Sequence, residues 1–161
     1  MARDVSALGV ERNIFRYRPM PVTLRLSEGE SLGHLVRLLA AASRAGATVD
    51  ISSAVPLPTP LVQTFADPSA PVMVRELVVE SDEAWLGKVR TLDSPRVRLI
   101  GGDPLALAEA LRGSVDVAIW SGPVTTSGRI ELLPFLHEQA ISITAHRFGN
   151  PDPEMAALRV E

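Results

Sequence analysis

The sequence predicts an α/β protein: a Rossmann-like, mostly parallel sheet of about five strands with flanking helices, followed by a terminal strand-like docking segment. Short runs rich in β-branched residues alternate with amphipathic segments at helical spacing, and the joints between them are short. One run, at 115–120, is mostly apolar, as the central strands of parallel sheets are. A chain of 161 residues, 46% apolar and 22% charged, is long enough to bury a core of its own.

The first half of the chain supplies three strands and a long helix. Residues 22–26 alternate apolar and polar side chains at period two, and residues 48–52 form a second short strand. Between them, Ser31 is the expected N-cap of a helix that Gly46 ends, and the apolar residues of this helix recur on one face. A proline-rich loop then leads to a third strand at 72–79.

The second half continues the alternation. Ser81 is the expected N-cap of a helix that precedes a fourth strand at 96–100. Asp103 is the expected N-cap of the next helix, and a fifth strand follows at 115–120. Two later segments are also expected to be regular: a helix over 129–139 and a strand over 140–144.

This order of elements predicts three segments. Residues 1–20 are polar and irregular, which indicates an N-terminal arm or linker. Residues 21–151 form the Rossmann-like domain, which includes a terminal motif at 132–150. Residues 152–161 are a tail.

Residue types exclude several function classes. The absence of cysteine excludes disulfides, thiolate metal sites and a cysteine nucleophile. A net charge of −3 speaks against a nucleic-acid partner. No apolar run approaches the roughly 18 residues of a transmembrane segment, and the N-terminus has no signal-peptide core, so we expect a cytoplasmic protein.

The best-placed motif for ligand chemistry is Gly101-Gly102-Asp103. It lies between a strand and a helix N-terminus, where α/β sheets bind phosphates. It lacks the G-x-G-x-x-G fingerprint, and Asp103 would repel a phosphate from the cap position. We therefore expect a tight turn, and an independent nucleotide-binding module at Gly101–Asp103 stays open as an alternative.

No catalytic, cofactor-binding or metal-ligating residue is expected. His137-Glu138 begins like H-E-x-x-H, but Ile141 stands where the second histidine would be. Ser121 lacks the glycine two residues before it that a nucleophile elbow needs.

Two long segments carry a resemblance to a known family. They are residues 11–19 (ERNIFRYRP) and 132–149 (LLPFLHEQAISITAHRFG), with the I-G-G-D run at 100–103 between them. They resemble the C-terminal region of bifunctional enzymes of the proline utilisation A type. These enzymes join a proline dehydrogenase to an L-glutamate-γ-semialdehyde (Δ1-pyrroline-5-carboxylate) dehydrogenase. The resemblance extends over about residues 8–151.

The resemblance implies a noncatalytic domain that is similar to aldehyde dehydrogenase Rossmann domains. NAD and FAD are cofactors of the parent family, and none is expected in this chain. The implied partner is the catalytic aldehyde dehydrogenase domain of the same or a companion chain, with a homo-oligomer left open. The implied role is assembly and closure of the tunnel through which the intermediate is channelled between the active sites. A scaffold that pairs with another protein through its terminal strand is a further alternative.

The terminal segment of such enzymes packs against the catalytic domain, and this implies a set of docking or lid residues here. Residues 141–143 match the family motif in place, whereas 146–148 replace small residues with bulky ones. The expected docking residues are Glu138, Ile141, Ser142, Ile143, Thr144, His146, Arg147, Phe148 and Gly149.

Overall fold

The structure is a computed structural model, and the residues that it describes are 2–6, 8, 10–147 and 150–158. The chain divides into two compact units. One unit is residues 19–136, and the other combines the two ends of the chain, 1–18 and 137–161. The segment 132–150, expected to belong to the Rossmann-like domain, divides between the units: residues 132–136 belong to the larger unit, and the described residues from 137 on group with the N-terminus.

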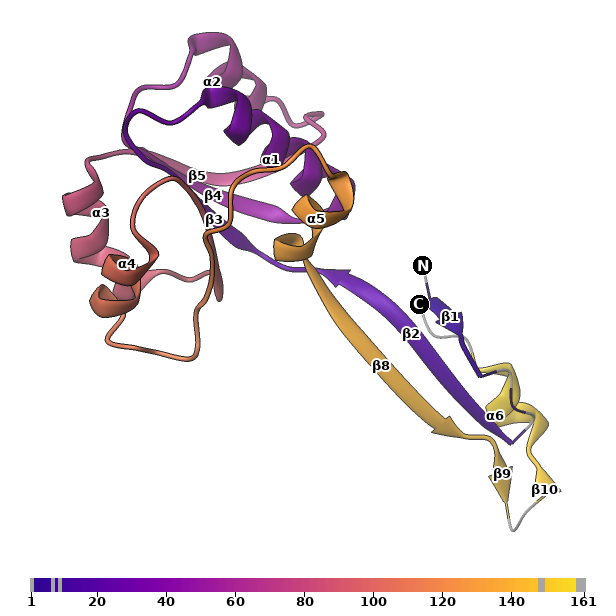
Figure 1. Cartoon of the computed structure of the whole chain (residues 1–161). Helices are drawn as coiled ribbons and strands as arrows, with labels where there is room; N and C mark the ends of the chain where they lie inside the picture. The colour runs from indigo at the N-terminus through magenta and orange to yellow at the C-terminus, as the bar shows by residue number, and fades with distance from the viewer. Residues whose placement is uncertain (1, 7, 9, 148–149, 159–161) are drawn as a thin grey trace. The chain divides into compact units, whose positions relative to one another are not determined.

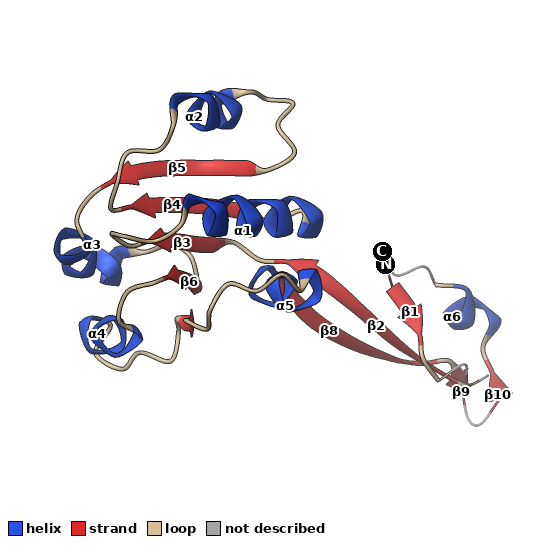
Figure 2. Cartoon of the chain, turned by 45° about the horizontal axis from the view of Figure 1, so that its top comes forward, coloured by secondary structure: helices blue, strands red, loops and turns tan. Residues whose placement is uncertain are grey.

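The larger unit is built on a five-stranded parallel sheet in the order β5-β4-β3-β6-β7. Figure 1 shows β5, β4 and β3 side by side, and Figure 2 shows β6 next to β3. From β3 the chain moves outward to β4 and β5, then returns to the other side of β3 for β6 and β7. This is the Rossmann-like α/β fold that the sequence predicted. The strand bounds are Val22–Leu26 (β3), Thr48–Ser53 (β4), Met73–Val79 (β5), Arg96–Ile100 (β6) and Ala118–Trp120 (β7).

Helices flank the sheet and begin where the sequence signals placed them. Ser31, Ser81 and Asp103 each accept a hydrogen bond from the first turn of the helix that follows. The first long helix ends at Gly46, as predicted. The helices are α1 (Leu32–Ala45), α2 (Thr59–Ala66), α3 (Asp82–Lys88), α4 (Pro104–Ala110) and α5 (Gly128–Leu132), with 3-10 turns at Val89–Thr91 and Leu133–Phe135.

Each face of the sheet has its own apolar core. On one face, α1 packs on β3 and β4, and Phe135 joins that core. On the other face, Trp85 of α3 and Leu107 of α4 pack against β6. Strand β6 contributes to both cores, since Ile100 lies in the first while Val97 and Leu99 lie in the second. The middle of the sheet is thus buried on both sides.

The smaller unit contains a three-stranded sheet in the order β1-β2-β8. A short ladder of β9 and β10 and one helix complete its described elements. No helix in the described residues is long and apolar enough to span a bilayer. The element bounds are Ala2–Asp4 (β1), Glu11–Pro19 (β2), Leu136–Thr144 (β8), His146–Arg147 (β9), Asn150–Pro151 (β10) and Pro153–Ala157 (α6).

Three sequence-based expectations about elements are wrong. The segment 1–20, expected to be irregular, contains the nine-residue strand β2, because its backbone pairs with β8 from the far end of the chain. The helix expected over 129–139 stops at the turn around Pro134, and the strand begins at Leu136 rather than at residue 140. The fifth strand of the large sheet is limited to 118–120.

Candidate functional site

The turn between β6 and α4 lies at the switch point of the large sheet. Strands β3 and β6 are neighbours, and the connections from them leave in opposite directions. Ligands of Rossmann-like folds bind outside the carboxyl ends of such a pair. Gly101 and Gly102 have φ angles of 73° and 75°, a region that favours glycine. The turn therefore stands where a phosphate-binding loop would stand.

The side chains around this turn leave a phosphate little room. A Cβ atom on Gly101 would lie 2.4 Å from Cγ of Glu30, and one on Gly102 would lie 2.8 Å from Oγ of Ser27. Asp103 uses its carboxylate on its own helix, where it accepts a 2.8 Å hydrogen bond from the backbone N–H of Leu105. The glycines allow close approach to the loop after β3, and the nearby carboxylates repel an anion. This geometry favours a structural turn over a nucleotide site.

Beside the turn, a fully buried arginine organises the polar groups on one face of the sheet. Nε and Nη2 of Arg25 donate to Oδ1 of Asp82 at 3.0 and 2.7 Å. Its Nη1 donates to Oγ of Ser52 at 2.7 Å, and its Nη2 also donates to the carbonyl oxygen of Glu80 at 3.1 Å. The guanidinium lies 5.3 Å from the ring centre of Trp85. These contacts satisfy a charge that would otherwise be costly to bury.

The contact with Arg25 lowers the pKa of the Asp82 carboxyl. Burial alone would raise the pKa of Asp82, but hydrogen bonds from Arg25 and Ser27 outweigh burial and hold that pKa below its ordinary value. Sequence reasoning missed the network, because Arg25 occupies a polar position of an alternating strand and such positions usually face solvent. The one available signal was that this strand lies at the centre of a parallel sheet, where both faces are covered.

The expected docking residues are brought together on the last strands of the smaller unit. Along β8, Ile141 and Ile143 are half-buried while Ser142 and Thr144 are exposed, so the strand alternates as the sequence predicted. The positions are Glu138, Ile141, Ser142, Ile143 and Thr144 on β8 and His146 and Arg147 on β9, whereas Phe148 and Gly149 lie outside the described residues.

Side chains on β2 hold β8 in place. The hydroxyl of Ser142 lies 2.7 Å from both Oε1 of Glu11 and Oδ1 of Asn13. Further along the strands, Nε of Arg16 donates to Oε1 of Gln139 at 2.7 Å. Side chains on both faces of β8 are therefore linked to the segment 11–19, which is the other half of the sequence resemblance.

Among the described strands, β8 has β2 on one side and no strand on the other, so it is an edge strand of this sheet. The backbone N–H of Ala145 donates to the carbonyl of Val10 at 2.8 Å. Because N–H groups alternate in direction along a strand, those of Ala140, Ser142 and Thr144 point to the open side. Among the described residues of this unit, only Ile14 and Ala145 are buried. Small sheets are stabilised by packing a hydrophobic face against another element, and few described side chains of this unit are buried in that way.

The histidines do not gather into a metal site. His34 lies in the first turn of α1, while His137 and His146 lie on β8 and β9. Over the described ranges, no group of three histidine or carboxylate side chains is placed to hold a metal ion.

Comparison with known proteins shows what this chain is similar to. No family model matches the chain, and no curated protein does. Among solved structures, proline utilization A from Corynebacterium freiburgense is similar to it, with 30% identical residues and a TM-score of 0.55. The alignment covers 93% of this chain. Over most of its length, the chain is thus similar to a part of proline utilization A.

The match covers only 12% of the other protein, so the chain corresponds to a domain-sized portion of a much larger one. The predicted resemblance is thereby confirmed at the level of the family. The coverage includes nearly all of this chain, and so the likeness is not limited to the Rossmann-like unit.

Proposed function

We propose that this chain is a noncatalytic assembly domain of a proline-catabolic enzyme. It docks on the catalytic, NAD-dependent L-glutamate-γ-semialdehyde dehydrogenase domain of the same or a companion chain. There it closes the cavity through which the intermediate passes to the second active site. The similarity to part of proline utilization A supports this role. Aldehyde dehydrogenases of this kind use a cysteine thiolate, and the sequence contains no cysteine, so this segment supplies no such nucleophile.

The observation that carries the proposal is the open edge of β8. No described strand pairs with the outer edge of the nine-residue strand β8, and an edge of this kind is a template for another strand. Native proteins usually shield such an edge, and here the unit buries only Ile14 and Ala145 among its described residues. A partner strand along β8 would pair the outward N–H groups and place its own side chains beside Ile141 and Ile143 on the same face.

The residues that follow β8 in the sequence are the remaining docking candidates of the proposal. His146, Arg147 and Phe148 follow directly in sequence. Arginine and aromatic side chains are common anchors of interfaces, each contributing about 2 kcal/mol or more when central. Their bulk fits the role of a lid that shields the intermediate from solvent.

A backbone-directed substitution tests the docking mode. Ala140 is exposed on β8, and its N–H points to the open edge, so Ala140→Pro removes a donor that the protein's own sheet does not use. We expect Ala140→Pro to keep the melting temperature within a few degrees and to lose co-purification with the tagged catalytic domain. Ala140→Val, which keeps the N–H, is the matched control and should bind like the wild type.

The outcomes separate the alternatives. Equal binding by both variants would show that docking does not use this edge. Failure of the wild-type chain to bind the catalytic domain would overturn the proposed function. Self-association that Ala140→Pro abolishes would instead favour the scaffold or homo-oligomer alternative.

A further inference from the structure

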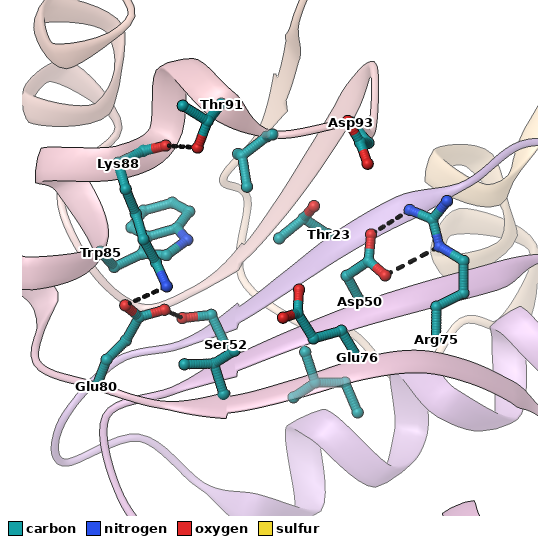
Figure 3. Close-up of a pocket in the computed structure, with 13 residues that line it drawn as sticks. Thr23, Asp50, Ser52, Arg75, Glu76, Glu80, Trp85, Lys88, Thr91 and Asp93 are labelled. Atoms are coloured by element: carbon teal, nitrogen blue, oxygen red, sulfur yellow. Dashed lines mark hydrogen bonds and ion pairs between the residues drawn. The ribbon is translucent and has the colours of Figure 1, made fainter.

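A polar cavity lies on the face of the large sheet that α1 does not cover. α1 packs against Val49 and Ile51 of β4, so the intervening residues Asp50 and Ser52 face the opposite side. There, β3, β4 and β5 form the floor and α3 with the following 3-10 turn forms one wall (Figure 3). The cavity has a volume of about 440 Å³, which falls within the range of small-molecule sites.

Two buried polar groups in this cavity lack a hydrogen-bond partner among the residues that the structure describes. Thr23 and Trp85 are only 2% and 3% exposed, and both line the cavity. Within the described residues, neither the Thr23 hydroxyl nor the Trp85 indole N–H makes a hydrogen bond. In Figure 3, Thr23 lies between Trp85 and Asp50 on the cavity floor. Buried polar groups are nearly always paired, so two orphans in one cavity indicate a missing occupant that offers hydrogen-bonding atoms.

Several other polar groups near Thr23 and Trp85 already have partners. Ser52 accepts from Arg25 at 2.7 Å and donates to Oε1 of Glu80 at 2.7 Å. Lys88 forms an ion pair of 2.7 Å with Oε2 of Glu80. These groups leave Thr23 and Trp85 as the places where an occupant gains new hydrogen bonds.

The charged side chains at the other end of the cavity determine which charge a bound ligand would carry. Arg75 forms an ion pair with Asp50, in which its Nε donates to Oδ1 at 2.9 Å. Glu76 and Asp93 also line the cavity, and no ion pair involves either of them in the described part of the chain. The pKa of Arg75 lies above its ordinary value. The hydrogen bond to Asp50 is the largest cause, and the negative charges of Asp93 and Glu76 raise this pKa further. One cation therefore faces three carboxylates here, which favours a second cation.

We propose that this cavity binds a small organic cation that also carries an acceptor oxygen, as a basic amino acid does. Its ammonium or guanidinium group lies by Glu76 and Asp93. Its acceptor oxygen receives the indole N–H of Trp85, and the Thr23 hydroxyl hydrogen-bonds to the same end. All the residues involved belong to the unit 19–136, so this inference is independent of the docking role.

L-Arginine is the probe, and L-citrulline is its neutral analogue of nearly the same shape. The chain has two tryptophans, so Trp120→Phe leaves Trp85 as the single fluorescent reporter. We expect L-arginine to shift Trp85 emission and to release or absorb heat in calorimetry, with at least tenfold weaker binding of L-citrulline. Equal binding of the two, or no binding of L-arginine at millimolar concentration, would overturn the proposal.

Variants locate the site. Glu76 and Asp93 are exposed, so Glu76→Gln with Asp93→Asn is expected to fold normally and to weaken L-arginine binding at least tenfold. Glu109→Gln, on the exposed surface of α4, is the matched control and should bind like the wild type. Unchanged affinity in the double variant would overturn the assignment.

The variant Thr23→Val tests whether the Thr23 hydroxyl binds a ligand or only stabilises the fold. Valine has nearly the shape of threonine, and the hydroxyl that it removes has no partner in the described residues. We expect the ligand-free melting temperature to stay the same or rise while L-arginine affinity falls several-fold. A lower melting temperature with unchanged affinity would show that the hydroxyl serves the fold and would contradict its role in binding.

Discussion

Replacing Glu131 by alanine should strongly destabilise the larger unit. Glu131 is 2% exposed, and its carboxylate accepts from the backbone N–H of Thr125 at 2.6 Å and from Nη2 of Arg98 at 3.2 Å. The variant would leave the buried Arg98 without its counter-ion. Breaking a buried ion pair on one side costs about 3–5 kcal/mol, out of a typical total stability of roughly 5–15 kcal/mol.

Because Arg98 keeps its other contacts in this variant, we expect the loss of stability to lie near the lower end of the range of about 3–5 kcal/mol. Its Nη1 still donates to the carbonyls of Leu99 and Gly122, each at 2.7 Å. A loss of about 3 kcal/mol corresponds to a fall in melting temperature of roughly 6–12 °C for a chain of this length. Trp85 and Trp120 both lie in this unit, so tryptophan fluorescence in a urea titration measures the free energy of unfolding directly.

A double variant supplies the control. Arg98→Met combined with Glu131→Leu removes both charges and keeps most of the buried volume, so it should cost less than Glu131→Ala alone. A loss below about 1 kcal/mol in Glu131→Ala, or a double variant that costs as much as the sum of the single ones, would refute this reasoning.

Four further predictions follow from the same structure. Hydrogen bonds from Thr125 and Arg98 outweigh burial and hold the pKa of Glu131 below its ordinary value. The ionised Glu131 therefore adds to the free energy of unfolding above about pH 4.3, and this stabilisation is lost as the pH falls through the lower pKa of the folded state. Glu131→Gln should therefore flatten the decline of stability in acid, and an unchanged slope in urea titrations would contradict this. The isolated chain should show no NAD-dependent oxidation of L-glutamate-γ-semialdehyde, and turnover above a blank would contradict that. Calorimetry should find NAD binding weaker than about 1 mM, whereas a micromolar isotherm would support a nucleotide site at Gly101–Asp103. Backbone amides of β2 and β8 should exchange hydrogen faster than those of β3 in the free chain and become protected when the catalytic domain is added. Equal protection with and without the partner would argue against docking through this sheet.

Local signals predicted much of the large unit. Ser31, Ser81 and Asp103 are caps whose side chains act within three residues of themselves, so their effect can be seen in the sequence alone. The strands β3 to β6 follow from short β-branched runs, and the α/β alternation then limits the topology.

Long-range pairing and burial were harder to predict. Strand β2 pairs with β8 from more than 100 residues away, and nothing near residues 11–19 marks them as one half of such a sheet. Arg25 and Arg98 occupy polar positions of central strands. The alternation of apolar and polar residues predicts that such side chains face solvent, but helices cover both faces of this sheet and the two arginines are buried. The docking role of residues 138–149 was implied by resemblance rather than by their chemistry, and it stays a prediction.

The most direct test of the central claim measures whether the intermediate escapes. Proline is supplied to the intact proline-catabolic enzyme, and NADH is followed from the first seconds. A closed tunnel predicts no lag before NADH appears. We expect Arg147→Ala with Phe148→Ala to leave the melting temperature of the isolated chain nearly unchanged and to produce a clear lag in the intact enzyme. A large fall in that melting temperature together with no lag would contradict the account and would make this segment part of the fold only.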